Sequence, residues 1–159
     1  MTRTTGLNRD DFQLLPDIRG EDDEDTALLR GMAEEARDFV TAHDWCPPIR
    51  NLYLATGVGA VVALFLVDFA QLIPGSEDDS LWLVVGDLPF AYFVTENSGT
   101  PREALETYCR LMDEWIVAVA NGGDLGEAYP VEAEPSIENA RELQSRVDFL
   151  RTEIIPAIS

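Results

Sequence analysis

The string His43-Asp44-Trp45-Cys46 contains the residue types of a thiol nucleophile and its base, and His43 is the only histidine of the chain. An attacking thiolate needs its base within hydrogen-bond reach, and the base usually comes from a distant part of the chain. Sequence neighbours rarely reach that geometry. A histidine at a helix end, beside a packed tryptophan and cysteine, explains the string without catalysis. A serine triad would need the same His43, so we predict no catalytic residue.

Carboxylates are the other groups that could do chemistry, and the chain has 30 of them. They are so numerous that many pairs would pass as a general acid and base or as a metal site. The best placed are Asp68, near the end of an apolar strand, and Asp87, in the turn Gly86-Asp87-Leu88-Pro89; turn chemistry explains Asp87 and a position at the rim of the sheet explains Asp68. A small enzyme that uses carboxylates and a divalent metal stays an alternative, but we expect no cofactor and no metal site.

Other motifs favour structure over chemistry. The acidic run 21–25 lacks the alternate spacing and the turning glycine of a calcium loop. Gly57-Val58-Gly59 lacks the third glycine of a dinucleotide loop and is typical of a hairpin turn. Cys46 and Cys109 have no second pair or histidine cluster nearby, so we expect free thiols and no zinc.

The composition excludes several classes of function. All 11 basic residues are arginine, which removes Schiff-base, phosphate-loop and kinase-type lysines. A net charge of −19 would repel nucleic acid, so we expect no nucleic-acid partner. The first residues have no apolar core of a signal peptide, and the apolar stretch 52–67 is shorter than the roughly 20 residues that span a bilayer. We therefore expect a cytoplasmic protein with no membrane partner.

Charge is unevenly distributed along the chain. Residues 51–99 contain acids and no base. A surface of one sign steers and holds a cationic partner, whereas interspersed bases would cancel its field. We predict a partner-binding surface for a basic protein, with an aromatic anchor from a loop. Its predicted residues are Asp68, Glu77, Asp78, Asp79, Asp87, Glu96 and Trp45.

The elements that must position these residues follow from periodicity and turn signals. Residues 1–25 are predicted to be a mobile acidic tail, and residues 26–159 a single α+β domain. We expect a first helix from Thr26 to about His43, where Pro47-Pro48 follows. Four strands are expected at 49–56, 60–69, 81–85 and 90–95. A capping box at Thr100-Pro101-Arg102-Glu103 and the pair Gly122-Gly123 bound the second helix, and Ser136 and Pro156 bound the third.

The predicted fold is therefore α+β: a four-stranded antiparallel meander sheet packed with three helices, in the order α-β-β-β-β-α-α. In the second expected strand both alternating faces are apolar, so the sheet must be covered on both sides, by helices or by a second copy of the chain. Homodimerisation stays open.

Three motifs resemble a family of small uncharacterised bacterial proteins: Cys46-Pro47-Pro48-Ile49-Arg50-Asn51-Leu52-Tyr53, the stretch 81–89 and the helix start at Thr100. The resemblance covers about residues 45–155 and implies no activity. In size, acidity and α+β pattern the chain also resembles immunity proteins that neutralise bacterial toxins. The leading hypothesis is a non-enzymatic binding module of the immunity or antitoxin type, with a self-associating structural or regulatory homo-oligomer as the alternative beside the metal enzyme.

Overall fold

The computed structural model describes residues 7–96, 98–122, 125–126, 128–131 and 133–158. Its sheet strands are β1 (Gln13–Leu14), β2 (Ile49–Val58), β3 (Val62–Phe69), β4 (Ser80–Gly86) and β5 (Ala91–Val94). Its α-helices are α1 (Asp23–Thr41), α2 (Pro101–Ala120) and α3 (Ile137–Phe149). A short 3-10 turn, η2 (Leu15–Asp17), follows β1, and α3 continues into the π turn η3 (Leu150–Ile154) and the 3-10 turn η4 (Ile155–Ala157).

All neighbouring strands are antiparallel, and their order in the sheet is β1-β2-β3-β4-β5. The predicted α+β fold with one antiparallel meander and three helices is confirmed. The predicted number of four strands is wrong, because β1 adds a fifth strand at the outer edge of β2 and precedes α1 in the chain. A strand of two residues is too short for alternation to show in the sequence.

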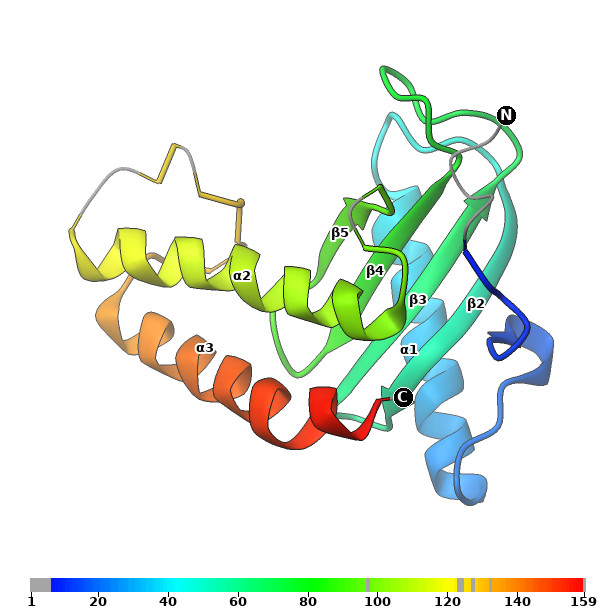
Figure 1. Cartoon of the computed structure of the whole chain (residues 1–159), viewed down its shortest axis with the longest axis horizontal. Coiled ribbons are helices and arrows are strands. Elements are labelled where there is room, and N and C mark those ends of the chain that lie inside the picture. The colour runs from blue at the N-terminus through cyan, green and yellow to red at the C-terminus, as the bar shows by residue number, and fades with distance from the viewer. Residues whose placement is uncertain (1–6, 97, 123–124, 127, 132, 159) are drawn as a thin grey trace.

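Helices cover both faces of the sheet, which makes three layers (Figure 1). On one face, α1 packs over Ala63, Phe65 and Val67 of β3. On the other face, α2 and α3 pack over Val62, Leu64 and Leu66. The alternation predicted for this strand is thus confirmed. Because the chain covers both apolar faces with its own helices, the sheet needs no second copy for that purpose, and homodimerisation stays a prediction.

Helix α2 has the predicted ends. The Thr100 hydroxyl accepts a hydrogen bond from the Glu103 amide at 3.2 Å, and the Glu103 carboxylate accepts one from the Gly99 amide at 3.1 Å. After α2, Gly122 has a φ of 65°, the left-handed conformation that commonly ends a helix. Gly123 lies outside the described residues. One face of α2 is buried, and it comprises Ala104, Leu105, Tyr108, Cys109, Met112, Trp115, Ile116 and Val119.

Helix α1 begins earlier than predicted. Asp22 caps it by accepting a hydrogen bond from the Asp25 amide at 2.8 Å, so part of the acidic run lies in the first turn of the helix rather than before Thr26. Carboxylates there are stabilised by the positive end of the helix dipole. In the segment before α1, Ile18 is fully buried. The division into a mobile tail at 1–25 and a domain at 26–159 stays a prediction.

The apolar stretch 52–67 forms most of the β2–β3 hairpin, which packs against helices on both sides. In the part of the chain that the structure describes, no helix is long and apolar enough to cross a membrane.

Both edges of the sheet are partly occupied. On the β5 edge, the Tyr129 hydroxyl accepts a hydrogen bond from the Tyr92 amide at 3.0 Å and donates one to the Tyr92 carbonyl at 2.8 Å. On the β2 edge, β1 pairs only with Tyr53 and Leu54. The outer edge of β2 from Ile49 to Leu52 therefore pairs with no strand of the described chain.

Candidate functional site

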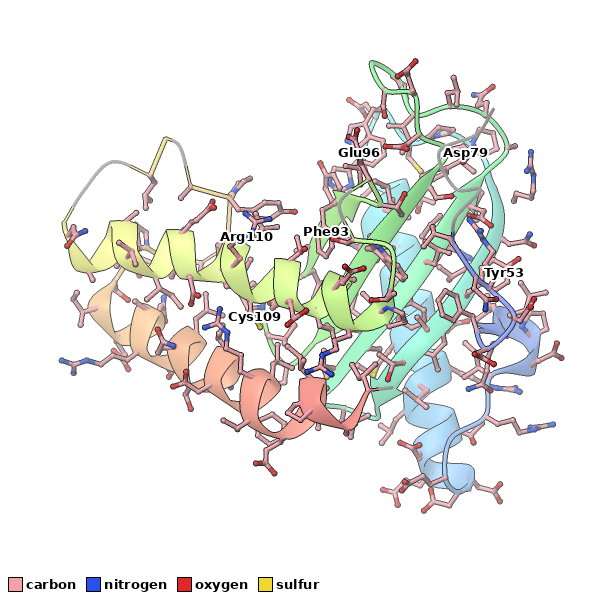
Figure 2. The ribbon with its side chains drawn as sticks, in the orientation of Figure 1. Tyr53, Asp79, Phe93, Glu96, Cys109 and Arg110 are labelled. Carbon is pink, nitrogen blue, oxygen red and sulfur yellow. The ribbon has the colours of Figure 1, made fainter. Side chains whose placement is uncertain are left out.

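One end of the sheet gathers most of the predicted binding residues. Strand β3 ends there and β4 begins there, so the loop 70–79 lies at this end, and the residues after β5 lie beside it. Figure 2 shows the labelled side chains of Asp79 and Glu96 at this end. The sequence folds back here through a type II turn: Gly75 has a φ of 77°, and the Ser76 amide donates to the Ile73 carbonyl at 3.0 Å.

Two further backbone hydrogen bonds hold the loop. The Ile73 amide donates to the Asp78 carbonyl at 2.8 Å, and the Phe69 amide donates to the Asp79 carbonyl at 2.8 Å. The Asp78 amide in turn donates to the Ser76 hydroxyl at 3.0 Å. These bonds fix the backbone that carries the three consecutive acids Glu77, Asp78 and Asp79.

Loop 70–79 and Glu96, which follows β5, line an open cleft of about 480 Å³. Three carboxylates line it: Glu77, Asp78 and Glu96. Glu77 and Glu96 are exposed, whereas Asp78 is only 3% exposed. Gly75 and Ser76 are the other described residues that line it. We call these five residues the acidic cleft, and every titratable group among these five described residues is an acid.

Asp68 has a different environment from the acidic cleft. Its carboxylate accepts hydrogen bonds from Arg9 Nε at 2.8 Å and Arg9 Nη2 at 2.7 Å, and from the Ser80 hydroxyl at 2.6 Å. The side chains of Arg9 and Asp68 are 22% and 14% exposed. The charge of Asp68 is therefore balanced, and the pair ties the N-terminal segment to the sheet.

Asp87 lies at the opposite end of the sheet, in the turn between β4 and β5. Arg146 of α3 contacts it twice: Nη2 lies 3.2 Å from the Asp87 carboxylate, and Nε donates to the Asp87 carbonyl at 2.7 Å. The structure thus brings Glu77, Asp78, Asp79 and Glu96 together and separates Asp87 from them.

Trp45 lies in the loop that joins α1 to β2, and this loop is at the same end of the sheet as loop 70–79, since the Ala70 amide donates to the Pro48 carbonyl at 2.8 Å. The Trp45 ring is half-buried, and its centroid lies 5.3 Å from that of His43 and 5.1 Å from that of Tyr92. Such aromatic pairs hold this loop in place at the end of the sheet that carries loop 70–79.

The string His43-Asp44-Trp45-Cys46 does not form a nucleophile and base. His43 Nδ1 lies 2.9 Å from the Phe39 carbonyl, at the end of α1, and the Cys46 thiol donates to the Pro47 carbonyl at 3.2 Å. Burial raises the pKa of the Cys46 thiol, which disfavours the reactive thiolate. Within the described ranges, no group of three or more His, Cys, Asp or Glu side chains is arranged to hold a metal ion.

Sequence reasoning missed the arginines Arg9 and Arg146, which balance Asp68 and Asp87. Each lies 59 positions from its partner, so no local spacing pairs them. The available signal for Arg9 was weak: it stands just before the apolar patch Phe12 to Leu15, which contains β1.

Comparison of the chain with protein-family models, with curated proteins and with solved structures found no match. The fold and the acidic cleft are therefore the basis for a functional proposal.

Proposed function

We propose that the protein is a non-enzymatic binding module, of the immunity or antitoxin type, that holds a basic protein partner at the acidic cleft. The observation that supports this is the described lining of the cleft, whose titratable groups are Glu77, Asp78 and Glu96, all acids. The described residues that line the cleft include no base, so the field at the cleft is negative and favours a cation.

A lysine or arginine side chain of a partner fits this cleft in charge and size. The exposed carboxylates of Glu77 and Glu96 would pair with it at the rim, and the backbone of loop 70–79 is already fixed, so little ordering entropy opposes binding. The net charge of −19 would attract a basic protein over a distance and speed the encounter.

The proposed contact surface is smaller than the predicted one. Glu77, Asp78 and Glu96 line the cleft, and Asp79 and Trp45 lie in loops at the same end of the sheet. Asp68 and Asp87 are outside the proposed contact surface, because each already pairs with an arginine.

The test is affinity capture of the tagged protein from lysate of its own organism at about 0.15 M salt, where the Debye length is roughly 8 Å. A stoichiometric basic protein that elutes with added salt is expected. Its affinity is then measured for the double variant Glu77→Gln/Glu96→Gln and for the control Glu106→Gln/Glu142→Gln, which removes the same charge from exposed positions of α2 and α3.

The cleft variant should weaken binding by about tenfold to a hundredfold, as expected for two charged contacts at an interface. The control variant should change the affinity by less than about threefold, through long-range charge alone. Equal losses in the two double variants would place the partner elsewhere on the surface. An empty column would remove the proposal and leave self-association to be tested by mass.

A further inference from the structure

A second hollow, of about 660 Å³, lies where the N-terminal segment turns away from β2. It is bounded by α1, by residues 14–16, by residues 46–48 and by the start of β2. Its titratable groups are Arg37, Arg50 and Cys46. We call it the arginine hollow. The chain has 30 acids and 11 bases. The described lining of this hollow has the opposite balance, with two arginines and no carboxylate.

Both arginines of the hollow lack an ion pair within the described ranges. Other arginines of the protein do pair with carboxylates, as Arg9, Arg146 and Arg151 show. Arg50 reaches only the Ala70 carbonyl, at 3.4 Å, beyond the usual N–H···O range. Arg37, on the exposed side of α1, has no such contact.

Arg50 lines the hollow at a bulge in β2. Ile49 pairs with Phe69 and Asn51 pairs with Asp68, so Arg50 is an extra residue without a partner in β3. A bulge of this kind re-aims a side chain and is common beside functional sites. The bulge therefore takes Arg50 out of the regular alternation of side chains along β2.

The hollow also contains a free strand edge. Strand β1 pairs with β2 only at Tyr53 and Leu54, so the backbone from Ile49 to Leu52 has no strand beside it among the described residues. Unpaired edge groups are a template for an added strand. The wall next to this edge is apolar, with Leu14, Ile49 and Leu52. Backbone groups, apolar contacts and two cations thus lie side by side.

We propose that the arginine hollow binds an extended acidic peptide segment of another protein, which adds as a strand beside Ile49–Leu52 and places a carboxylate against Arg37 and Arg50. Strand addition uses the free edge, and alternate side chains of the peptide meet the apolar wall and the guanidinium groups. A guanidinium pairs with a carboxylate through charge-assisted hydrogen bonds. A second copy of the chain is disfavoured, because it would bring a whole body of charge −19 against another, whereas a peptide segment brings only a few carboxylates next to the two guanidinium groups.

The test uses two blocked peptides, Val-Glu-Val-Glu-Val and its glutamine analogue Val-Gln-Val-Gln-Val, with the full-length protein. Binding is followed by amide chemical shifts and by the rate at which maleimide labels Cys46. Cys109 is fully buried, so labelling reports on Cys46. The glutamate peptide should shift the amides of residues 49–52, slow the labelling of Cys46 and bind at least tenfold more tightly than the glutamine peptide.

The variants Arg37→Gln and Arg50→Gln should each weaken the glutamate peptide by about fivefold to tenfold. Arg102→Gln is the matched control, because Arg102 is exposed and lies outside the hollow. Equal binding of the two peptides to the unsubstituted protein would overturn the proposal, and this comparison does not depend on whether a variant folds. An equal loss with Arg102→Gln, shifts confined to other strands, or the same shifts produced by acetate alone would also overturn it. If the mass of the protein in solution doubled as its concentration rose, and the Arg50→Gln variant stayed a monomer, the outer edge of β2 would be assigned to a second copy of the chain instead.

Discussion

The ion pair of Arg9 with Asp68 should contribute measurably to folding, and the pair of Arg146 with Asp87 should not. Both pairs join an arginine to an aspartate 59 positions away, so the chain entropy of closing the two loops is the same. They differ in burial and geometry. Arg9 and Asp68 are 22% and 14% exposed, whereas Arg146 and Asp87 are 40% and 76% exposed.

The expected magnitude lies between two limits. Exposed ion pairs contribute about 0–1 kcal/mol, and removal of one partner from a buried pair costs about 3–5 kcal/mol. The Arg9–Asp68 pair is mostly buried, has two hydrogen bonds below 2.9 Å, and includes the Ser80 hydroxyl at 2.6 Å. We expect a coupling free energy of about 2 kcal/mol for this pair and below about 0.5 kcal/mol for Arg146–Asp87.

The assay is a pair of double-mutant cycles, with Arg9→Gln and Asp68→Asn in one and Arg146→Gln and Asp87→Asn in the other. Urea unfolding is followed by tryptophan fluorescence, because Trp82 and Trp115 are buried. Repeating the cycles in about 1 M salt should remove the coupling of Arg146–Asp87 and leave most of the other, since burial limits screening. Equal coupling energies in the two cycles, or less than about 0.5 kcal/mol for Arg9–Asp68, would refute the reasoning.

Two further predictions concern packing and titration. A Cβ on Gly59 would lie 2.5 Å from the Asp25 carboxylate, so Gly59→Ala should destabilise the protein by about 1–3 kcal/mol. Gly31 lies inside α1 with open space around it, so Gly31→Ala should stabilise the protein by about 0.5–1 kcal/mol in the same urea assay. Burial raises the pKa of Cys109 from 9.0 to about 11, so the unfolded chain releases this proton first. The contribution of Cys109 to the free energy of unfolding should be fully present below pH 9 and fall by about 3 kcal/mol as the pH rises through 11. Cys109→Ala should flatten this dependence of the unfolding free energy on pH. An unchanged slope in the alanine variant, or equal effects of the two glycine substitutions, would contradict these expectations.

Local signals predicted the long elements well. Helix α2 followed from a capping box, a proline at its first position and a glycine after its end, all of which act within a few residues. The alternating apolar faces of β3 predicted coverage on both sides, and the helices supply it. Strand β1 was missed because it has two residues and gains its hydrogen bonds from β2, about forty positions away along the chain.

The separation of the acids follows from a rule that the sequence did offer. In an antiparallel meander, successive connections alternate between the two ends of the sheet. The β3–β4 loop and the residues after β5 must therefore share one end, and the β4–β5 turn with Asp87 must lie at the other. A single acidic surface over all six predicted carboxylates was thus incompatible with the predicted fold itself. The partners Arg9 and Arg146 could not be predicted, because tertiary packing alone brings them to the acids.

The acidic cleft and the arginine hollow belong to the same end of the sheet, and their opposite charges allow the two proposals to be separated. Replacing Arg37 and Arg50 by glutamine changes the net charge from −19 to −21. Long-range attraction for a basic partner at the cleft would then rise slightly, while an acidic peptide would lose its contacts in the hollow. The variant Glu77→Gln/Glu96→Gln should have the reverse effect on both ligands. If one double variant weakened both ligands, the two surfaces would form one continuous site, and a single partner with basic and acidic segments would have to occupy it.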